Sequence, residues 1–267
     1  MRVNRLNEME MYIISNGTAT LQELAEKFGV SVNSVRRDMS ALMERGNIRK
    51  VYGGVSAIDN GVVSPFHLRQ NFRINEKRSI GQLAAEFVPD NTVVFLDSGT
   101  TVPCVVPYLA QKSGIVVVTY SQIAIKEIEK YPSLELLSLG GRFNHITCSF
   151  TGLFTLNAIA SLNIPIAFMA ATGVSLTHGL SNSTETEAQI KKAVTQQSQK
   201  VILMADHSKF SREAIISYYS YSDLYAVVTD RALESDFAET ARHYGVIVST
   251  PEDPQVKTTD TVRPFLA

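Results

Sequence analysis

Hydrogen-bonding and basic side chains that suit contacts with DNA gather near the start of this 267-residue chain. They fall between positions 33 and 52: Asn33, Ser34, Arg36, Arg37, Arg49, Lys50 and Tyr52. Arginine can bind guanine through two hydrogen bonds, asparagine can bind adenine in the same way, and any of the first four can instead hold a phosphate. The last three suit flanking phosphates or the adjacent minor groove. The formal net charge of −1 hides a local excess, because five bases between positions 36 and 50 face only two acids.

Three short helices and a hairpin are predicted to position these side chains. Apolar residues recur at helical spacing in three segments: Leu6, Met9 and Ile13, then Leu21, Leu24, Ala25 and Phe28, then Val32, Val35, Met39 and Leu42. Thr20 with Glu23 has the form of a capping box for the second helix, and Ser31 suits the N-cap of the third. Residues 47–57 carry β-branched residues and a Gly-Gly pair, as a small wing would. We therefore predict a winged helix-turn-helix over residues 1–57, with Thr20 and Ser31 also among its DNA-contacting residues. The alternative is a solvated helical hairpin whose arginines bind nothing.

A second group of polar residues follows a predicted strand at 92–96. The sequence Asp97-Ser98-Gly99-Thr100-Thr101 combines hydroxyl groups with a glycine where a helix could begin. Free backbone N–H groups and the positive end of a helix dipole favour an anion at such a turn. Serine and threonine are also common as simple helix caps, so this loop alone is a weak signal.

Further polar residues stand at other predicted strand ends: Ser121, Gly141, Gly173 and Lys209. Strand-like segments at 92–96, 115–119, 134–139, 164–170, 201–205, 225–229 and 246–249 alternate with helical ones. This alternation predicts a Rossmann-like α/β domain, a mostly parallel sheet covered on both faces, whose ligand crevice lies at the carboxyl ends of the strands. We place this domain at 76–267 and a linker at 58–75.

Composition excludes several other classes of protein. Hydrophobic residues make up 45% and charged residues 19% of the chain, as in a globular protein. No apolar stretch reaches the roughly 20 residues that cross a bilayer, and no secretory signal is present, so we expect a cytoplasmic protein without membrane contact. Cys104 and Cys148 lack the spacing of a zinc or redox site, and neither a metal nor a cofactor is predicted.

The stretch TLQELAEKFGVSVNSVRRDM, from Thr20 to Met39, together with VYGGV in the wing, resembles the signature of the DeoR family of bacterial transcriptional regulators. Its most specific pieces are the Val30-Ser31 turn and the Arg36-Arg37-Asp38 triplet. This chain has Ser34-Val35 where members usually carry Thr-Ile. The resemblance implies binding to a double-stranded DNA operator. Because helix-turn-helix proteins pair to meet two half-sites, a homodimer or higher homo-oligomer is expected.

The resemblance extends to about Thr250, through DSGTT at 97–101, LGGRF at 139–143, ATGVS at 171–175 and ADHSKF at 205–210. It implies a sensor domain with a fold similar to ribose-5-phosphate isomerase. By that resemblance, Ser98 to Thr101 hold the phosphate of a phosphorylated sugar, while Asp97, Gly141, Gly173 and Lys209 line the sugar site. Two departures are Tyr120, where the family has Asn, and the lack of an Asp before Phe168. A bulky Tyr120 would change which sugar fits.

These patterns favour a repressor of carbohydrate-metabolism genes that a phosphorylated sugar releases from DNA. The alternative is a sugar-phosphate isomerase or deaminase with an accessory DNA-binding domain. Its candidate bases would be Asp97, Glu185, Glu187, Asp206, His145, His178 and His207, and nothing pairs them at a convincing spacing. A purely architectural DNA-binding protein would leave the large domain without a purpose.

Overall fold

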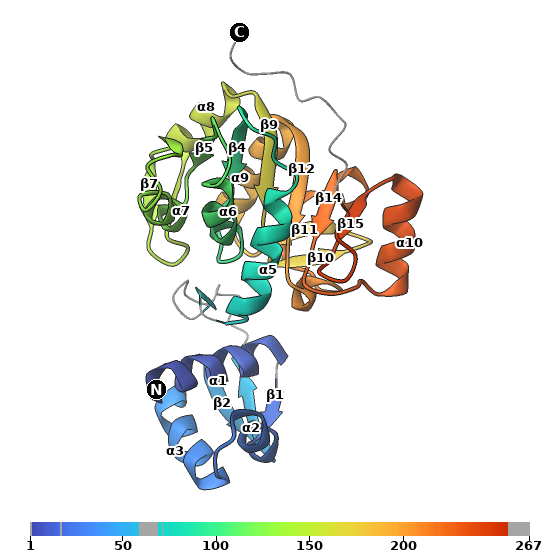
Figure 1. Ribbon diagram of the computed structural model, residues 1–267. Helices are drawn as coiled ribbons and strands as arrows, with labels where there is room; N and C mark the ends of the chain where they lie inside the picture. Colours follow the sequence, from blue (N-terminus) through green and yellow to red (C-terminus); the bar gives the residue numbers. More distant parts are fainter. Residues whose placement is uncertain (1, 17, 59–68, 71, 256–267) are drawn as a thin grey trace. The chain divides into compact units, whose positions relative to one another are not determined.

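Figure 1 shows the computed structural model, which describes residues 2–16, 18–58, 69–70 and 72–255. The chain divides into two compact units, Met1–Phe72 and Arg73–Ala267. Helix α5 (Ile74–Ala85) begins at the start of the second unit, so the last two residues of the linker predicted at 58–75 belong to a helix. Most of that predicted linker lies outside the described residues. None of the helices in the described part of the chain is long and apolar enough to span a membrane.

The first unit is a winged helix-turn-helix, as predicted. Its elements in chain order are α1 (Arg2–Asn16), β1 (Thr18–Thr20), α2 (Leu21–Phe28), α3 (Val32–Met43), β2 (Ile48–Val51) and β3 (Gly54–Ala57). The strands form an antiparallel sheet in the order β1-β3-β2, in which β2 and β3 are the wing. The sequence did not predict β1, because a strand of three residues has too short a pattern to show a period of two.

Local signals fix the ends of α2 and α3. The Thr20 hydroxyl accepts a hydrogen bond from the Glu23 N–H, and the Glu23 carboxylate accepts one from the Thr20 N–H, so the predicted capping box is present. Gly29 ends α2 with a left-handed φ of 61°. Ser31 accepts from the Ser34 N–H and begins α3. The third helix is therefore held in place at its first turn.

A seven-stranded parallel sheet forms the centre of the second unit. Its order is β15-β14-β12-β9-β4-β5-β6. The strands are β4 (Val93–Leu96), β5 (Val116–Thr119), β6 (Glu135–Ser138), β9 (Ile164–Met169), β12 (Ser198–Met204), β14 (Ala226–Val228) and β15 (Ile247–Ser249). Each corresponds to one predicted strand. The chain moves outward from β4 to β6 and then returns to place β9 on the other side of β4, so the direction of winding reverses between β4 and β9.

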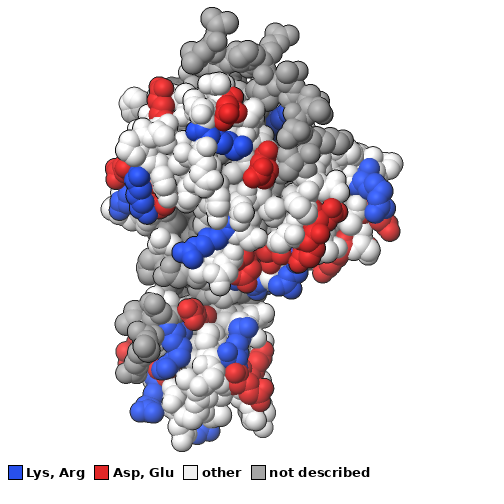
Figure 2. All heavy atoms as spheres, in the orientation of Figure 1, with Lys and Arg blue, Asp and Glu red and all other residues white. Residues whose placement is uncertain are grey.

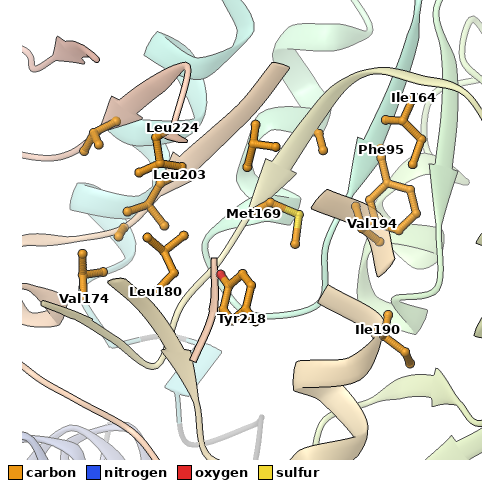
Figure 3. Close-up of a cluster of buried hydrophobic side chains, with 14 of the residues drawn as sticks. Phe95, Ile164, Met169, Val174, Leu180, Ile190, Val194, Leu203, Tyr218 and Leu224 are labelled. Atoms are coloured by element: carbon orange, nitrogen blue, oxygen red, sulfur yellow. The ribbon is translucent and has the colours of Figure 1, made fainter. Parts of the chain in front are cut away.

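Helices cover both faces of this sheet (Figure 1). Helices α5, α6 (Val106–Leu109) and α7 (Gln122–Ile128) pack on one face, and α8 (Leu153–Ala160), α9 (Glu185–Gln196) and α10 (Ser235–Tyr244) pack on the other. Each group of helices packs with the sheet in a core of its own, the first with α5, α6 and α7 and the second with α8, α9 and α10. The side chains of β4 alternate between the two faces, so Val94 and Leu96 lie in the first core and Val93 and Phe95 in the second. Figure 3 shows side chains of the large sheet and α9 in the second core, together with Val174, Leu180 and Tyr218 from a smaller sheet.

Two small antiparallel pieces extend from the carboxyl edge of the large sheet. A hairpin, β7 (Arg142–Asn144) and β8 (Ser149–Thr151), follows β6, and the sheet of β10 (Gly173–Ser175), β11 (Gly179–Asn182) and β13 (Ile216–Tyr219) begins after β9. The sequence does not predict them, because strands of three or four residues give little pattern. Both pieces therefore follow strands of the large sheet at the edge where the ligand crevice is expected.

Candidate functional site

One face of α3 is polar along its whole length. Val35, Asp38, Met39 and Leu42 are buried, whereas Asn33, Arg36, Arg37 and Ser40 are exposed. The exposed four, which we call the recognition stripe, follow the i, i+3, i+4, i+7 spacing of a single helix face. The sequence predicted three of them and missed Ser40, whose spacing from Asn33 was the available signal. Ser34 is half-buried and lies beside the stripe.

Several of the predicted DNA-contacting residues are engaged within the helix-turn-helix itself. Thr20 and Ser31 serve as helix caps, and the Ser34 hydroxyl lies 3.0 Å from that of Ser31. An Arg36 N–H donates to Asn33 Oδ1 at 3.1 Å. The side chains of Thr20, Ser31 and Ser34 thus hold α2 and α3 in shape, in addition to any contact with DNA.

The basic residues of this unit fall into two sets. Two guanidinium groups are committed to buried carboxylates: Arg5 donates twice to Asp38, at 2.7 and 3.0 Å, and Arg45 pairs with Glu10. None of the described residues forms a hydrogen bond or an ion pair with Arg37, Arg49 or Lys50, all of which are exposed. These three cations remain available for phosphates. Figure 2 shows acidic side chains beside the basic ones on the face of this unit in view, so its positive charge is local.

The tip of the wing presents an aromatic ring. Tyr52 stands in the turn between β2 and β3, next to Gly53 with a φ of 81°, and its side chain is fully exposed at 108%. Arg49 and Lys50 precede it on β2. A basic hairpin with an exposed ring at its tip suits contact with the DNA backbone or minor groove.

In the second unit, a cluster of buried polar side chains lies at the point where the sheet reverses its winding. Ligands of open α/β sheets bind at such a switch point. Asp97, directly after β4, is completely buried. Its carboxylate accepts hydrogen bonds from the N–H groups of Ser98 and Ala170, both at 2.8 Å, from the Tyr120 hydroxyl and from the Lys191 ammonium. Asp97 therefore joins β4, β5, β9 and α9 in one network.

A second buried carboxylate extends this network. Glu187 accepts from Ser98 Oγ at 3.2 Å, from Asn182 Nδ2 at 3.0 Å and from Thr184 Oγ1 at 3.2 Å. Burial, with the nearby Asp97 and Glu187 carboxylates, raises the pKa of Tyr120 well above its ordinary value, so its hydroxyl stays a donor. We call Asp97, Ser98, Tyr120, Glu187 and Lys191 the polar floor. Sequence reasoning missed Lys191; the signal was a Glu and a Lys four residues apart on the apolar face of a predicted helix.

The predicted phosphate loop begins in this floor, with Asp97 and Ser98, and continues through Gly99 to Thr101. Gly99 has a φ of 127°, and a Cβ there would meet the Ala170 side chain at 3.3 Å. Among the described residues, none accepts a hydrogen bond from the backbone N–H of Gly99 or Thr100. The loop continues into a 3₁₀ turn (Val102–Val105) and then the four-residue α6, and Pro103 falls in the first turn where proline is tolerated. A helix dipole therefore adds little here, and an anion would depend on backbone N–H groups and hydroxyls.

The loop after β12 carries the predicted Lys209 and a cluster of charged groups. Burial alone would raise the pKa of Asp206, but the Lys209 ammonium, a hydrogen bond from Ser208 and the Arg73 guanidinium lower it more strongly, so the pKa is below its ordinary value. His207 Nδ1 donates to Asp230 Oδ2 at 2.6 Å, and the Arg73 guanidinium donates to the same imidazole. Arg73 is the first residue of the second unit.

Three other predicted residues are not members of the polar floor. Ser121 is buried and accepts from the Ala124 N–H, so it caps α7. Gly173 packs where a Cβ would come within 2.6 Å of the Arg212 carbonyl oxygen. Gly141 borders a separate groove of about 920 Å³ beside α8. Asp97 and Ser98 therefore belong to the polar floor, Ser121 caps α7, Gly141 borders the groove beside α8, and the loops after β4 and β12 leave the same edge of the sheet on either side of β9.

Comparison with known proteins connects both units to one group. The DeoR-like helix-turn-helix domain matches residues 5–60, and the DeoR C-terminal sensor domain matches residues 73–231. The transcriptional regulator IolR of Bacillus subtilis (strain 168) is 37% identical over 92% of this chain and 98% of its own length. The glycerol-3-phosphate regulon repressor of Escherichia coli (strain K12) is 28% identical over 86% of this chain and 91% of its own length. Ribose-5-phosphate isomerase A of Methanocaldococcus jannaschii is 19% identical, with a TM-score of 0.37 over 50% of this chain and 53% of its own.

Proposed function

Because this chain belongs to the DeoR family of transcriptional regulators, we propose that it is a cytoplasmic repressor that leaves its operator when a phosphorylated sugar binds the second unit. Both relatives described above are regulators by name, and one is the repressor of a regulon named for glycerol 3-phosphate, a small phosphorylated polyol. A homodimer would place two recognition stripes on two half-sites about one turn of DNA apart.

The observation that carries the effector proposal is that two loops with anion-binding groups leave the carboxyl edge of the sheet, one after β4 and one after β12, with β9 between them. The loop after β4 offers the free N–H groups of Gly99 and Thr100, and the loop after β12 brings Lys209. Backbone donors, hydroxyls and an ammonium are the groups that bind phosphate. We assign the phosphate to Gly99, Thr100 and Thr101, and the sugar hydroxyls to the side near Asp206 and Lys209.

The polar floor supports a sensor more than an enzyme. Asp97 already accepts four hydrogen bonds and Glu187 accepts three. A general base needs a free lone pair within reach of the substrate; the four bonds to Asp97 occupy all of its acceptor sites, and three of the four sites on Glu187 are occupied. The same bonds join α9 to three strands, so a ligand that disturbs them can shift the arrangement of the unit.

Sugar-phosphate binding is tested by thermal unfolding of the full chain with triose, pentose and hexose phosphates and their unphosphorylated parents. A ligand that binds only the folded state raises the melting temperature, and we expect one phosphorylated sugar to do so. Thr100→Ala should abolish that shift. Thr186→Ala is the matched control, since Thr186 lies on the separate groove beside α8. The same sugar should then release operator DNA from the unmodified chain.

Two results would contradict the effector assignment. A panel in which no phosphorylated sugar stabilises the protein removes the sensor function from this pocket. A shift that Thr186→Ala abolishes and Thr100→Ala leaves intact moves the ligand to the groove beside α8.

A further inference from the structure

Two residues of the recognition stripe are bonded to each other before any DNA is present. Arg36 NH1 donates to Asn33 Oδ1 at 3.1 Å, and both side chains are exposed on the same face of α3, one turn apart. The orientation of the amide is fixed by this contact, because a guanidinium group has only donors and must face the oxygen of the asparagine. The bond therefore turns the Asn33 oxygen toward Arg36 and occupies one of its two lone pairs.

With that oxygen turned toward the guanidinium group, most of the hydrogen-bonding groups that Asn33 and Arg36 have left are N–H donors. An asparagine that binds adenine through two hydrogen bonds must accept from N6–H and donate to N7. Guanine, in contrast, offers two acceptors, O6 and N7, in the major groove. A pair that offers mostly donors matches guanine better than adenine.

The position of this pair is set by the buried side of α3. Asp38 is 1% exposed and accepts two hydrogen bonds from Arg5 of α1, while Val35, Met39 and Leu42 pack in the core. The helix cannot rotate without breaking this ion pair and exposing those apolar side chains. The bond between Asn33 and Arg36 also restrains a long arginine side chain, so less rotamer freedom is lost when it meets a base.

Arg37 differs from Arg36 although it is its neighbour in the sequence. No described residue bonds to the Arg37 side chain. A cation that no described residue orients suits the phosphate backbone, which requires charge and little geometry. The two arginines of the triplet therefore have different chemical surroundings.

We propose that Asn33 and Arg36 act as one unit that reads a guanine in the major groove of each half-site, and that Arg37 holds a phosphate. This inference rests on the DNA-binding function of the family and is independent of the sugar-phosphate effector. It assigns base recognition to a pair of residues and not to either one alone.

Selection from a random double-stranded DNA library with the full-length chain tests this assignment without knowledge of the operator. The unmodified chain should select at least one invariant guanine per half-site. Arg36→Ala should lose that preference, so that discrimination of guanine from the other bases falls roughly 5- to 150-fold, the range expected for one bidentate contact. Asn33→Ala should weaken the guanine preference without replacing it by another base.

Arg37→Ala is the matched control for Arg36→Ala. It should keep the selected sequence, weaken binding to all sequences alike, and reduce the slope of log affinity against log salt by about 1. Both arginines are exposed, so neither substitution should unfold the chain. Circular dichroism of each variant checks that the helices are intact.

Three outcomes would overturn the proposal: no invariant guanine in the selected sequences, an invariant adenine that disappears with Asn33→Ala, or a guanine preference that Arg37→Ala removes and Arg36→Ala retains. A chain that selects no sequence at all would contradict operator binding itself. Loss of the sugar-phosphate response would leave this test unaffected.

Discussion

Removing the ammonium group of Lys191 should strongly destabilise the second unit. Lys191 is 3% exposed and its partner Asp97 is fully buried. In Lys191→Met, Asp97 keeps its bonds from Ser98, Ala170 and Tyr120 but loses the only opposite charge that contacts it among the described residues. Leaving one buried charge of a pair uncompensated costs about 3–5 kcal/mol. In a unit of this size each kcal/mol lowers the melting temperature by roughly 2–4 °C, so we expect a decrease of roughly 6–20 °C.

Differential scanning calorimetry of the full chain measures this effect. A second lysine pair provides the comparison, because Lys130 contacts Glu127 within the same unit but is 62% exposed. Lys130→Met should leave the melting temperature almost unchanged, since solvent already screens that pair. The double variant Asp97→Asn with Lys191→Met should regain part of the loss, because position 97 then no longer carries an unpaired charge.

The reasoning about burial fails if Lys191→Met lowers the melting temperature no more than Lys130→Met does. It also fails if the double variant loses the full sum of the two single changes, because the two groups would then be energetically independent.

Three further predictions concern glycine, an acid group and a cap. Gly141→Ala should destabilise the second unit by about 1–3 kcal/mol, because its φ is 154° and a Cβ would meet the Thr151 carbonyl oxygen at 2.7 Å; Gly140→Ala, with nothing within 4 Å, should be tolerated in the same urea titration. The lowered pKa of Asp206 stabilises the fold above the unfolded carboxyl pKa of about 4, and this contribution is lost as the pH falls through the folded value. Since Lys209→Met removes the largest lowering influence, that variant should melt at a lower temperature at about pH 7, and its melting temperature should fall less between about pH 7 and about pH 3 than that of the unmodified chain. Thr20→Ala should cost the helix-turn-helix about 0.5–2 kcal/mol, and a calorimetric transition of the first unit that does not move would contradict the role of the cap.

Much of the fold followed from local patterns. Thr20, Glu23, Gly29 and Ser31 mark helix ends through bonds to their own backbone neighbours, so their effect is readable within four residues of sequence. The central strands of the parallel sheet, such as β4 and β9, are buried on both faces, which requires continuous apolar runs that stand out from the helices between them. Each of these signals depends on short-range physics.

The candidate site was only partly predictable because its contacts join distant segments. Asp97 was expected at the carboxyl edge as a group lining the sugar site, but its bond to Lys191 connects residues 94 positions apart. No spacing in the sequence indicates that pair. Tyr120 was noted as a departure that would change the sugar, whereas the structure makes it a donor to Asp97. The side chains of the floor bond to each other across the fold, and a linear pattern cannot show that.

The contact between Arg73 and His207 has a consequence for protein engineering. Arg73 belongs to the second unit, precedes the first turn of α5 and adopts a left-handed φ of 55°, while its guanidinium reaches the loop that carries Lys209. A chimaera that exchanges DNA-binding units should therefore be spliced between Phe72 and Arg73. A junction placed one residue later would replace Arg73 and remove its hydrogen bond to His207. The start of α5 would then lose a contact with the loop that carries Lys209, and the response of the chimaera to its ligand should weaken.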